Sequence, residues 1–415
     1  MNQLISIVGL LAILLLGWLA STDRKAIRWR PILAGLGIQF ALALFILKLP
    51  GGQALFQWLG ARITALLDFS KQGSSFVFGK LVDVPGFAFI FAFQVLPTIV
   101  FMAALIAILY YLGIVQAIVQ ILAWVVSRTL GTSAAESLSA AACVFVGQVE
   151  GPLLVRPYIG TMTRSELMAL MTGGMSTIAG GVMAAYLGLL GKDWAPSLLA
   201  ASLMGAPAGL VMAKLMVPET GEPRTRGKVE LAVERHESSV IEAAAKGAID
   251  GMHLAFNVGA MLLAFISLLA LVNAAIGWLP GHLDTWFGWH LPVVSLQMLF
   301  GAAFSPLAFL MGVPWSEAVT VGGLIGQKLA LNEFVAYADL VELIRRGELS
   351  ERSIRLATFA LCGFANFSSI AQNVGGIGAM APERRGDLAQ LGLRAMVAGA
   401  LASCLSAAMA GMLLP

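Results

Sequence analysis

The sequence predicts an all-α polytopic membrane protein, with about eight transmembrane helices and two re-entrant helical hairpins in an inverted repeat. Apolar residues make up 59% of the 415 residues, and charged residues make up 12%, about half of what a soluble domain carries. At about 20 apolar residues per span, such a chain allows roughly 8–10 crossings. The apolar runs are long and do not alternate with polar residues, which excludes an outer-membrane barrel.

The same composition excludes several classes of function. The net charge of +3 and the lack of a basic stripe argue against a nucleic-acid partner. The three cysteines, Cys143, Cys362 and Cys404, form no C-x-x-C pair, and no two of the four histidines stand at ligand spacing. We therefore expect no disulfide framework, no structural metal and no cofactor.

Eight apolar segments are long enough to cross a bilayer. They cover residues 3–20, 32–47, 87–112, 165–190, 195–216, 251–279, 353–380 and 387–413. Residues 50–86 are mixed and are expected to form an outside connection with an interfacial helix. Two more helices are expected at 114–130 and 293–312, and an outside loop rich in Trp and His at 280–292.

Basic residues set the expected orientation. A positive cluster at 23–30 follows the first span, which places that loop in the cytoplasm and the N-terminus outside. Residues 217–250 are interpreted as a cytoplasmic loop with an amphipathic helix. Counting the crossings puts residues 340–355 outside, although their arginines favour the cytoplasmic side. The other basic loops all fall on the cytoplasmic side, as expected. Those loops are 23–30, 156–164, 214–246 and 383–394.

Two segments are interpreted as re-entrant hairpins, at 133–158 and 314–338. Each is apolar on average but carries glycine and polar residues at its centre, which suits a tip buried in protein or lining water. Two of the spans are interpreted as broken helices, at Gly173–Gly181 and Gly363–Ser369. A break exposes N–H groups at one new helix end, which suit hydroxyls or anions. It exposes C=O groups at the other new end, which suit a cation.

The two halves repeat these features in the same order. Glu136 and Glu317 open the hairpins, and Glu150 and Glu333 lie near their tips. The number of membrane crossings between the two hairpins means that the two repeats enter the membrane from opposite sides. This inverted repeat is the architecture of secondary transporters whose site lies near the midplane.

Glu150 and Glu333 are the central candidates for a binding site. An ionised side chain at the bilayer centre costs at least about 2.5–3.5 kcal/mol, so a functional role is favoured over a structural polar network. Neutralisation of Glu333 by Lys328 remains an alternative. Carboxylates, amides and hydroxyls suit a neutral, hydroxyl-rich solute, and Phe364 and Phe367 suit a flat ring.

The run Gly326-x-Lys328-x-x-x-Asn332-Glu333-Phe334-Val335-Ala336-Tyr337 resembles the signature of the concentrative nucleoside transporter family. Residues 146–158 resemble the family's first hairpin, and residues 176–180 and 363–370 resemble its two broken helices. The resemblance covers roughly residues 80–400 well and the first two spans only by pattern.

The resemblance implies a cation-coupled nucleoside symporter, not an enzyme, that works by alternating access. It also implies a homotrimer in the bacterial cytoplasmic (inner) membrane, in which a transport domain moves against a scaffold. On this basis residues 1–130 and 251–312 are expected to form scaffold, and residues 131–216 and 313–415 the two transport-domain repeats. Residues 217–250 remain the cytoplasmic loop.

The resemblance also implies residue roles. Gln148 and Glu150 would bond the nucleobase, and Glu333, Asn366 and Ser369 the ribose hydroxyls. The remaining expected contacts are Gly147, Val149, Val182 and, as the aromatic wall, Phe364. The cation-coupling candidates are Cys143, Val146, Ser176 and Thr177.

Two positions depart from the family pattern. Val149 stands where the family usually has Thr or another polar residue, which removes one nucleobase hydrogen bond. Cys143 stands where sodium-coupled members have Asn, and a neutral thiol is a poor ligand for a hard cation. The coupling ion is thus Na⁺ or H⁺, with weakened sodium coupling, and Glu150 or Glu333 is the candidate proton carrier.

Two other functions remain open on the residues alone. A buried carboxylate pair could support acid–base chemistry in an intramembrane enzyme acting on a polar lipid-linked group. A passive channel for polar solutes would need a similar lining. Gradient-driven, saturable accumulation separates the symporter from both.

Overall fold

The computed structural model describes residues 2–82, 90–225, 237–287 and 295–414, and for 279–287 the backbone alone. Within these ranges the chain is helical and forms no strand, which confirms the predicted fold class. The first half contains α1 (Asn2–Leu19), α2 (Trp29–Leu47), α3 (Pro50–Phe78), η1 (Gly79–Val82), α5 (Phe91–Gln94), α6 (Leu96–Tyr111), α7 (Ile114–Leu130), α8 (Ala134–Ala142), α9 (Glu150–Leu153), α10 (Arg156–Ile159), α11 (Arg164–Met175), α12 (Gly180–Leu190), η2 (Lys192–Trp194) and α13 (Ala195–Met216). The second contains α14 (Val240–Phe287), α15 (Leu296–Leu310), α16 (Trp315–Ala330), α17 (Glu333–Arg346), α18 (Glu351–Leu361), α19 (Phe367–Met380), η3 (Pro382–Arg384) and α20 (Arg385–Leu413).

Seven stretches of the described chain are long and apolar enough to cross a membrane. They are Asn2–Leu19, Trp29–Leu47, Phe91–Tyr111, Arg164–Leu190, Lys192–Met216, Val240–Trp278 and Pro382–Leu413, and each overlaps a predicted span. The predicted broken span 353–380 is divided into two short helices, α18 and α19, as expected. The pair α15 and α16 meets the same test only when its two helices, bent by 117°, are counted together.

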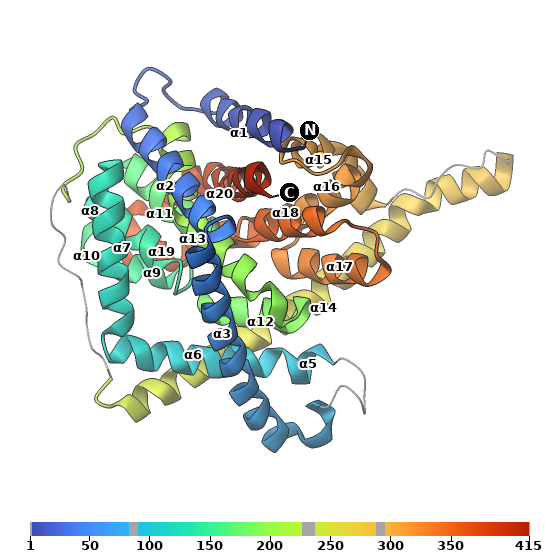
Figure 1. Ribbon diagram of the computed structural model, residues 1–415, viewed down its shortest axis with the longest axis horizontal. Helices are drawn as coiled ribbons and strands as arrows, with labels where there is room; N and C mark the ends of the chain where they lie inside the picture. Colours follow the sequence, from blue (N-terminus) through green and yellow to red (C-terminus); the bar gives the residue numbers. More distant parts are fainter. Residues whose placement is uncertain (1, 83–89, 226–236, 288–294, 415) are drawn as a thin grey trace.

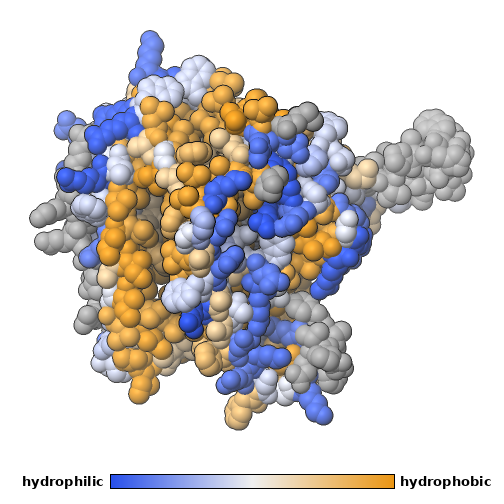
Figure 2. Space-filling view, viewed as in Figure 1, coloured by the Kyte–Doolittle hydropathy of each residue, from blue (hydrophilic) through white to orange (hydrophobic). Residues whose placement is uncertain are grey.

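Large apolar side chains are exposed on the outer helices, as a bilayer requires. The window of α14 within Val240–Trp278 is 17% buried, whereas that of Arg164–Leu190 is 89% buried. Leu263 on α14 and Leu11 on α1 are among the many large apolar side chains left exposed. Figure 2 shows apolar residues covering much of one face. The α11–α13 region therefore lies in the protein interior, and α1 and α14 present apolar surface outward.

The helix expected within residues 50–86 covers 50–78, and Pro50 starts it because its fixed φ suits the first helical position. Two other predicted boundaries were wrong. The helix predicted to begin at 251 begins at Val240, because Gly247 and Gly251 let its first turns pack closely on α6. The same helix continues to Phe287 through most of the predicted loop 280–292, and residues 288–294 lie outside the described residues.

The helix breaks are shorter than predicted. Break 1 comprises residues 176–179, because Gly173 and Gly174 belong to α11. These two glycines serve packing, since added Cβ atoms would meet Ala140 of α8 and Gln148. Break 2 comprises residues 362–366, and its Gly363 has φ +128°, a value that L side chains rarely adopt.

The described helices form two repeats with matching contacts (Figure 1). In the first repeat, hairpin 1 (residues 134–159) is followed by the broken helix α11–α12 and the unbroken α13. In the second, hairpin 2 (residues 315–346) is followed by α18–α19 and α20. Helix α8 packs on α11 as α16 packs on α18, and α11 packs on α13 as α18 packs on α20. The central helices α13 and α20 pack on each other.

Helix α20 shows that the repeats enter from opposite ends. At its start, Arg384 donates to the carbonyl oxygens of Gly160 and Met162, just before α11. At its end, Arg352 in the first turn of α18 donates to the carbonyl oxygen of Gly411. The 29 residues of α20 span roughly 43 Å at 1.5 Å per residue. The inverted repeat is therefore confirmed.

The basic loops follow the same division. Thr22 donates its backbone N–H to Met216 O, which places the 23–30 loop near the end of α13. Arg352, one of the arginines of residues 340–355, lies at the opposite end of the molecule, as the number of crossings requires. Near it, Gln3 donates to Leu414 O, so the described N-terminal turn also lies at that opposite end.

Candidate functional site

Hairpin 1 brings a polar turn into the middle of the molecule. A capping box of Ser133 and Glu136 starts α8, and the chain leaves helical structure after Ala142. Residues 143–149 form the tip, and α9 begins at Glu150. An added Cβ on Gly147 would lie 2.0 Å from Glu150 Oε2, so glycine there lets the carboxylate fold back over the tip.

Break 1 lies directly against this tip. The Thr177 hydroxyl donates to Cys143 O over 3.0 Å and to Gly173 O over 2.9 Å. The Ser176 hydroxyl donates to Gly173 O over 3.1 Å. Gly180, the first residue of α12, donates its N–H to Phe145 O. The end of α11 and the hairpin tip therefore form one polar unit.

The tip of hairpin 2 and the end of break 2 each carry an asparagine that caps the following helix. Asn332 Oδ1 accepts from Val335 N over 3.0 Å and starts α17. Asn366 Oδ1 accepts from Ser369 N over 2.9 Å and starts α19. Asparagine is a preferred N-cap because its side chain satisfies an otherwise unpaired helical N–H. Both caps bring a positive helix end to the same region.

Glu333 lies where these two helix ends meet, with 3% of its surface exposed. Its Oε1 accepts a 3.0 Å hydrogen bond from the Tyr186 hydroxyl, and its Oε2 accepts a 2.9 Å bond from Asn366 Nδ2. Hydrogen bonds to a carboxylate are stronger than those between neutral groups and hold it in a fixed orientation.

A second network joins hairpin 1 to α19. Gln148 Nε2 donates to Ser369 Oγ over 3.0 Å and to Gln372 Oε1 over 2.8 Å. Asn373 Nδ2 in turn donates to Gln148 Oε1 over 3.0 Å. Gly376, one turn further along α19, faces Val149, and a Cβ there would lie 2.5 Å from Val149 Cγ1. The hairpin tip thus fits tightly on α19.

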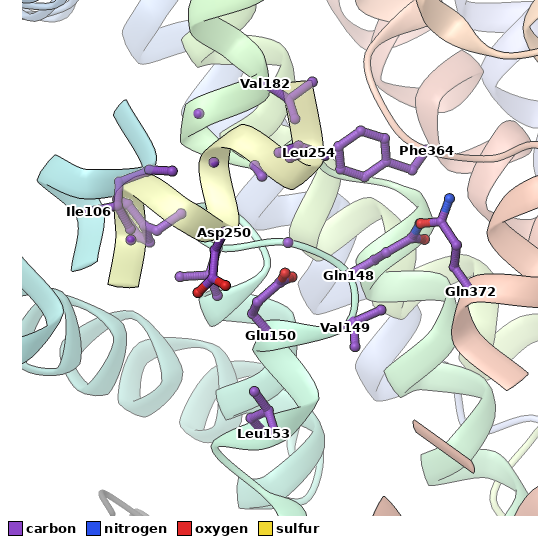
Figure 3. A pocket seen from close by; sticks show the side chains of 18 of the residues that line it. Ile106, Gln148, Val149, Glu150, Leu153, Val182, Asp250, Leu254, Phe364 and Gln372 are labelled. Atoms are coloured by element: carbon purple, nitrogen blue, oxygen red, sulfur yellow. The ribbon is translucent and has the colours of Figure 1, made fainter. Parts of the chain in front are cut away.

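These groups line a cavity of about 550 Å³. That volume lies within the range of about 300–1,000 Å³ typical of small-molecule sites. All nine residues predicted to contact substrate line it, namely Gly147, Gln148, Val149, Glu150, Val182, Glu333, Phe364, Asn366 and Ser369. Figure 3 shows Gln148, Glu150 and Phe364 around the hollow.

The four cation-coupling candidates divide between the cavity and the protein behind it. Val146 lines the cavity, whereas Cys143, Ser176 and Thr177 are buried and are not among its lining residues. All four lie on the tip of hairpin 1 or in break 1. They therefore belong to one place in the fold, adjacent to the cavity.

The opposite wall of the cavity comes from α6 and α14, and sequence reasoning missed it. Asp250 and Lys246 of α14 line the cavity, but the sequence assigned both to a loop. Gln372 was also missed, although its place three residues after Ser369 puts it on the same helix face. The cavity extends to Arg156 and Pro157 of α10, at the end of the molecule where α11 begins.

Family models match most of the chain. A model described as Na+ dependent nucleoside transporter N-terminus matches residues 8–81, and its C-terminus counterpart matches residues 197–411. The chain belongs to the Na+ dependent nucleoside transporter family. A third model, described as nucleoside recognition, matches residues 92–193 and includes hairpin 1 and break 1.

Individual relatives agree with this family. The uncharacterized transporter YutK of Bacillus subtilis is 48% identical over 99% of this chain and 100% of its own length. Sodium/nucleoside cotransporter 1 of Mus musculus is 42% identical over 99% of this chain, and the match covers 64% of the length of the mouse protein. These relatives are transporters rather than enzymes, which confirms that expectation.

Solved structures of family members have the same fold. CNTnw in an inward-facing substrate-bound state matches with a TM-score of 0.92 and 44% identity, over 100% of this chain and 98% of that one. A CNTnw variant in an outward-facing state also matches with a TM-score of 0.92, at 43% identity and the same coverage. The family fold is therefore known on both sides of an alternating-access cycle.

Proposed function

We propose that this chain carries nucleosides across the bacterial cytoplasmic membrane together with a cation, by alternating access. The observation that carries this proposal is the convergence of Gln148, Glu150, Glu333, Asn366 and Ser369 on one cavity in a member of this family. Hydroxyl-rich solutes need carboxylate and amide partners of this kind.

The two hydrogen-bond networks suggest which residues bind the ribose and which bind the nucleobase. Glu333, Asn366 and Ser369 form the ribose-binding side, because the carboxylate of Glu333 can accept from two hydroxyls. Gln148 and Glu150 form the nucleobase side, with Gly147, Val149 and Val182 lining it and Phe364 as an aromatic wall. Val149 offers no hydrogen bond, so base discrimination rests on Gln148 and Glu150 alone.

The coupling cation is proposed to bind at hairpin 1 and break 1. Carbonyl and hydroxyl oxygens of Cys143, Ser176 and Thr177 gather there, and these are donors that hard cations prefer. The soft thiol of Cys143 weakens this set for Na⁺. We therefore propose weak sodium coupling or proton coupling, with Glu150 or Glu333 carrying the proton.

The assembly and orientation are proposed to follow the family. The chain forms a homotrimer in which residues 1–130 and 251–312 are mainly scaffold, while residues 131–216 and 313–415 carry the moving repeats. The ends where α11 starts and α13 finishes face the cytoplasm, because the 23–30 loop lies there, and the N-terminus faces outside. The cavity, which reaches Arg156, then opens inward.

Uptake of radiolabelled uridine into proteoliposomes tests the function. Unlabelled nucleosides should compete and free sugars should not, while Na⁺ and pH are varied separately. Product formation by purified protein without a gradient would favour an intramembrane enzyme instead. Non-saturable equilibration would favour a passive channel.

A further inference from the structure

Lys328 is a basic side chain in the protein interior that the proposed transport site does not use. It lies in the last turns of α16 and is 1% exposed. Its Nζ donates to Ala360 O over 2.9 Å and to Ser403 Oγ over 3.1 Å. A buried ammonium in a membrane protein is costly and needs a compensating role.

The partners of Lys328 belong to the carboxyl end of α18. Ala360 lies in the last turn of that helix, which ends at Leu361, and Ser403 of α20 donates to Cys362 O over 2.7 Å. The last carbonyl groups of a helix carry negative partial charge, and a cation there is favourable. Lys328 thus provides a positive charge where break 2 begins.

Among the described residues, no basic side chain forms a hydrogen bond at the corresponding place in the first repeat. There the end of α8 meets the end of α11, just as the end of α16 meets the end of α18. The groups present are the hydroxyls of Ser176 and Thr177, the carbonyls of Gly173 and Cys143, and the Cys143 thiol.

One further buried hydroxyl of the first repeat lacks a partner. Thr172 Oγ1 of α11 has no hydrogen-bond partner within the part of the chain that the structure describes. Unpaired buried oxygens are unfavourable unless a ligand or ion uses them. The first repeat therefore has oxygen atoms available where the second has an ammonium group.

The two helix ends also lie against each other. A Cβ on Gly363 of break 2 would lie 2.8 Å from Met175 O, the last residue of α11. Two carbonyl ends with negative partial charge therefore converge at the centre of the protein. Each needs a positive charge, and only one is supplied by the side chains just described.

We propose that Lys328 is a tethered cation. Its ammonium compensates the negative partial charge at the carboxyl end of α18 in the second repeat. An exchangeable cation does the same at the carboxyl end of α11 in the first repeat, so cation exchange is confined to break 1. By bonding Ala360 O directly and Cys362 O through Ser403, it also fixes the break that carries Phe364 and Asn366 into the cavity. The comparison with break 1 rests on the proposed function, whereas the role of Lys328 at α18 does not.

Lys328→Ala in the purified full chain tests this proposal. The variant should bind a small primary ammonium ion in the space left by the side chain. Propylammonium chloride should raise its thermal unfolding temperature by about 2 °C or more relative to tetramethylammonium chloride, which has no N–H donor. The native protein and Lys192→Ala, which removes an exposed lysine paired with Asp68, should show no such difference. Equal responses of Lys328→Ala and Lys192→Ala would overturn the proposal.

Two further variants keep the test decisive if the alanine variant does not fold. Lys328→Arg keeps the charge, and Lys328→Met keeps the length without it. Nucleoside binding should survive in the arginine variant and weaken about tenfold or more in the methionine variant. Binding by Lys328→Met within twofold of the native protein, or equal loss in both variants, contradicts the proposal. Failure of the native protein to bind any nucleoside would instead refute the proposed function, leaving the propylammonium result to decide on Lys328.

Discussion

Asn366 Nδ2 donates a 2.9 Å hydrogen bond to Glu333 Oε2, and this contact joins the amino ends of two helices that lie far apart in the sequence. Glu333 is the first residue of α17, and Asn366 caps α19. The carboxylate therefore lies between two positive helix ends, with the Tyr186 hydroxyl on its other oxygen. This arrangement holds the Glu333 carboxyl group in a fixed orientation toward the cavity, where it can bond a substrate.

Glu333→Gln should abolish concentrative uptake while the protein stays folded. Glutamine keeps the shape but loses the charge, and each hydrogen bond to a charged group is worth about 1.5–3 kcal/mol, or roughly 10- to 100-fold in affinity. Uptake and thermal unfolding should be measured together, with Glu342→Gln as the control on the same helix, since that residue forms an exposed pair with Arg346. Normal uptake by Glu333→Gln would remove the residue from the site.

Asn366→Ala should have the same effect by a different route. It removes both the donor to Glu333 and the cap of α19, and loss of an N-cap costs about 1 kcal/mol of stability. We expect lost uptake with a modestly lowered unfolding temperature. A lowered unfolding temperature with normal uptake would show that the helix cap contributes to stability and that the substrate contact is not needed.

Two neighbouring glycines on α19 give a matched pair. Gly376→Ala places a methyl group 2.5 Å from Val149 Cγ1 and should displace the tip of hairpin 1, which weakens nucleoside binding several-fold. Gly375→Ala meets nothing within 4 Å and should leave binding unchanged, with stability raised by up to about 1 kcal/mol. Binding isotherms of the two variants decide, and equal affinities would contradict the close fit of the tip on α19.

Lys214→Met should destabilise the fold strongly. Lys214 Nζ lies 2.6 Å from Glu136 Oε2, with side chains 6% and 1% exposed, so removing one partner leaves a buried charge at a cost of about 3–5 kcal/mol. The double variant Lys214→Met with Glu136→Gln should recover part of that loss, because Glu136 is then uncharged and only the weaker pair of Lys214 with Glu219, 3.6 Å apart, is left broken. Thermal unfolding of the native protein, the two single variants and the double variant gives the interaction energy, and strictly additive losses would show that the pair does not interact.

Cys143→Asn should strengthen sodium dependence. The amide oxygen is a hard donor where the native thiol is soft, so uptake by the variant should be activated at lower Na⁺ concentration than uptake by the native protein. Cys404→Ser, on α20 in the protein interior, serves as the control. Identical sodium activation of the native and Cys143→Asn proteins would place the coupling ion elsewhere.

The sequence predicted which residues line the cavity better than it predicted the helix boundaries. Glu150 and Glu333 could be found because carboxylates are rare in apolar segments and because they occupy matching places in the two repeats. Gln148 stands beside Glu150 in the sequence, and Asn366 was found through the resemblance of residues 363–370 to the family's second broken helix. Gln372 carries no such signal, since its role depends on which face of α19 meets Gln148. Tyr186 was missed because a tyrosine in an apolar helix looks like core until its partner Glu333 is known.

The wrong boundaries have a common physical cause, which is packing between distant segments. Gly173 and Gly174 suggested a helix break, yet they are helical because α8 and the hairpin tip need close approach there. Residues 240–250 are polar enough to resemble a loop, but contact with α6 makes them helix and turns Asp250 and Lys246 toward the cavity. Neither contact can be deduced from local composition.

The most direct test of the central claim is the time course of radiolabelled uridine in proteoliposomes under an imposed cation gradient. The account predicts that internal uridine rises above the external concentration under a sodium or proton gradient, saturates with substrate, and collapses when an ionophore dissipates the gradient. Internal uridine that only equals the external concentration, or that ignores both gradients, would contradict it.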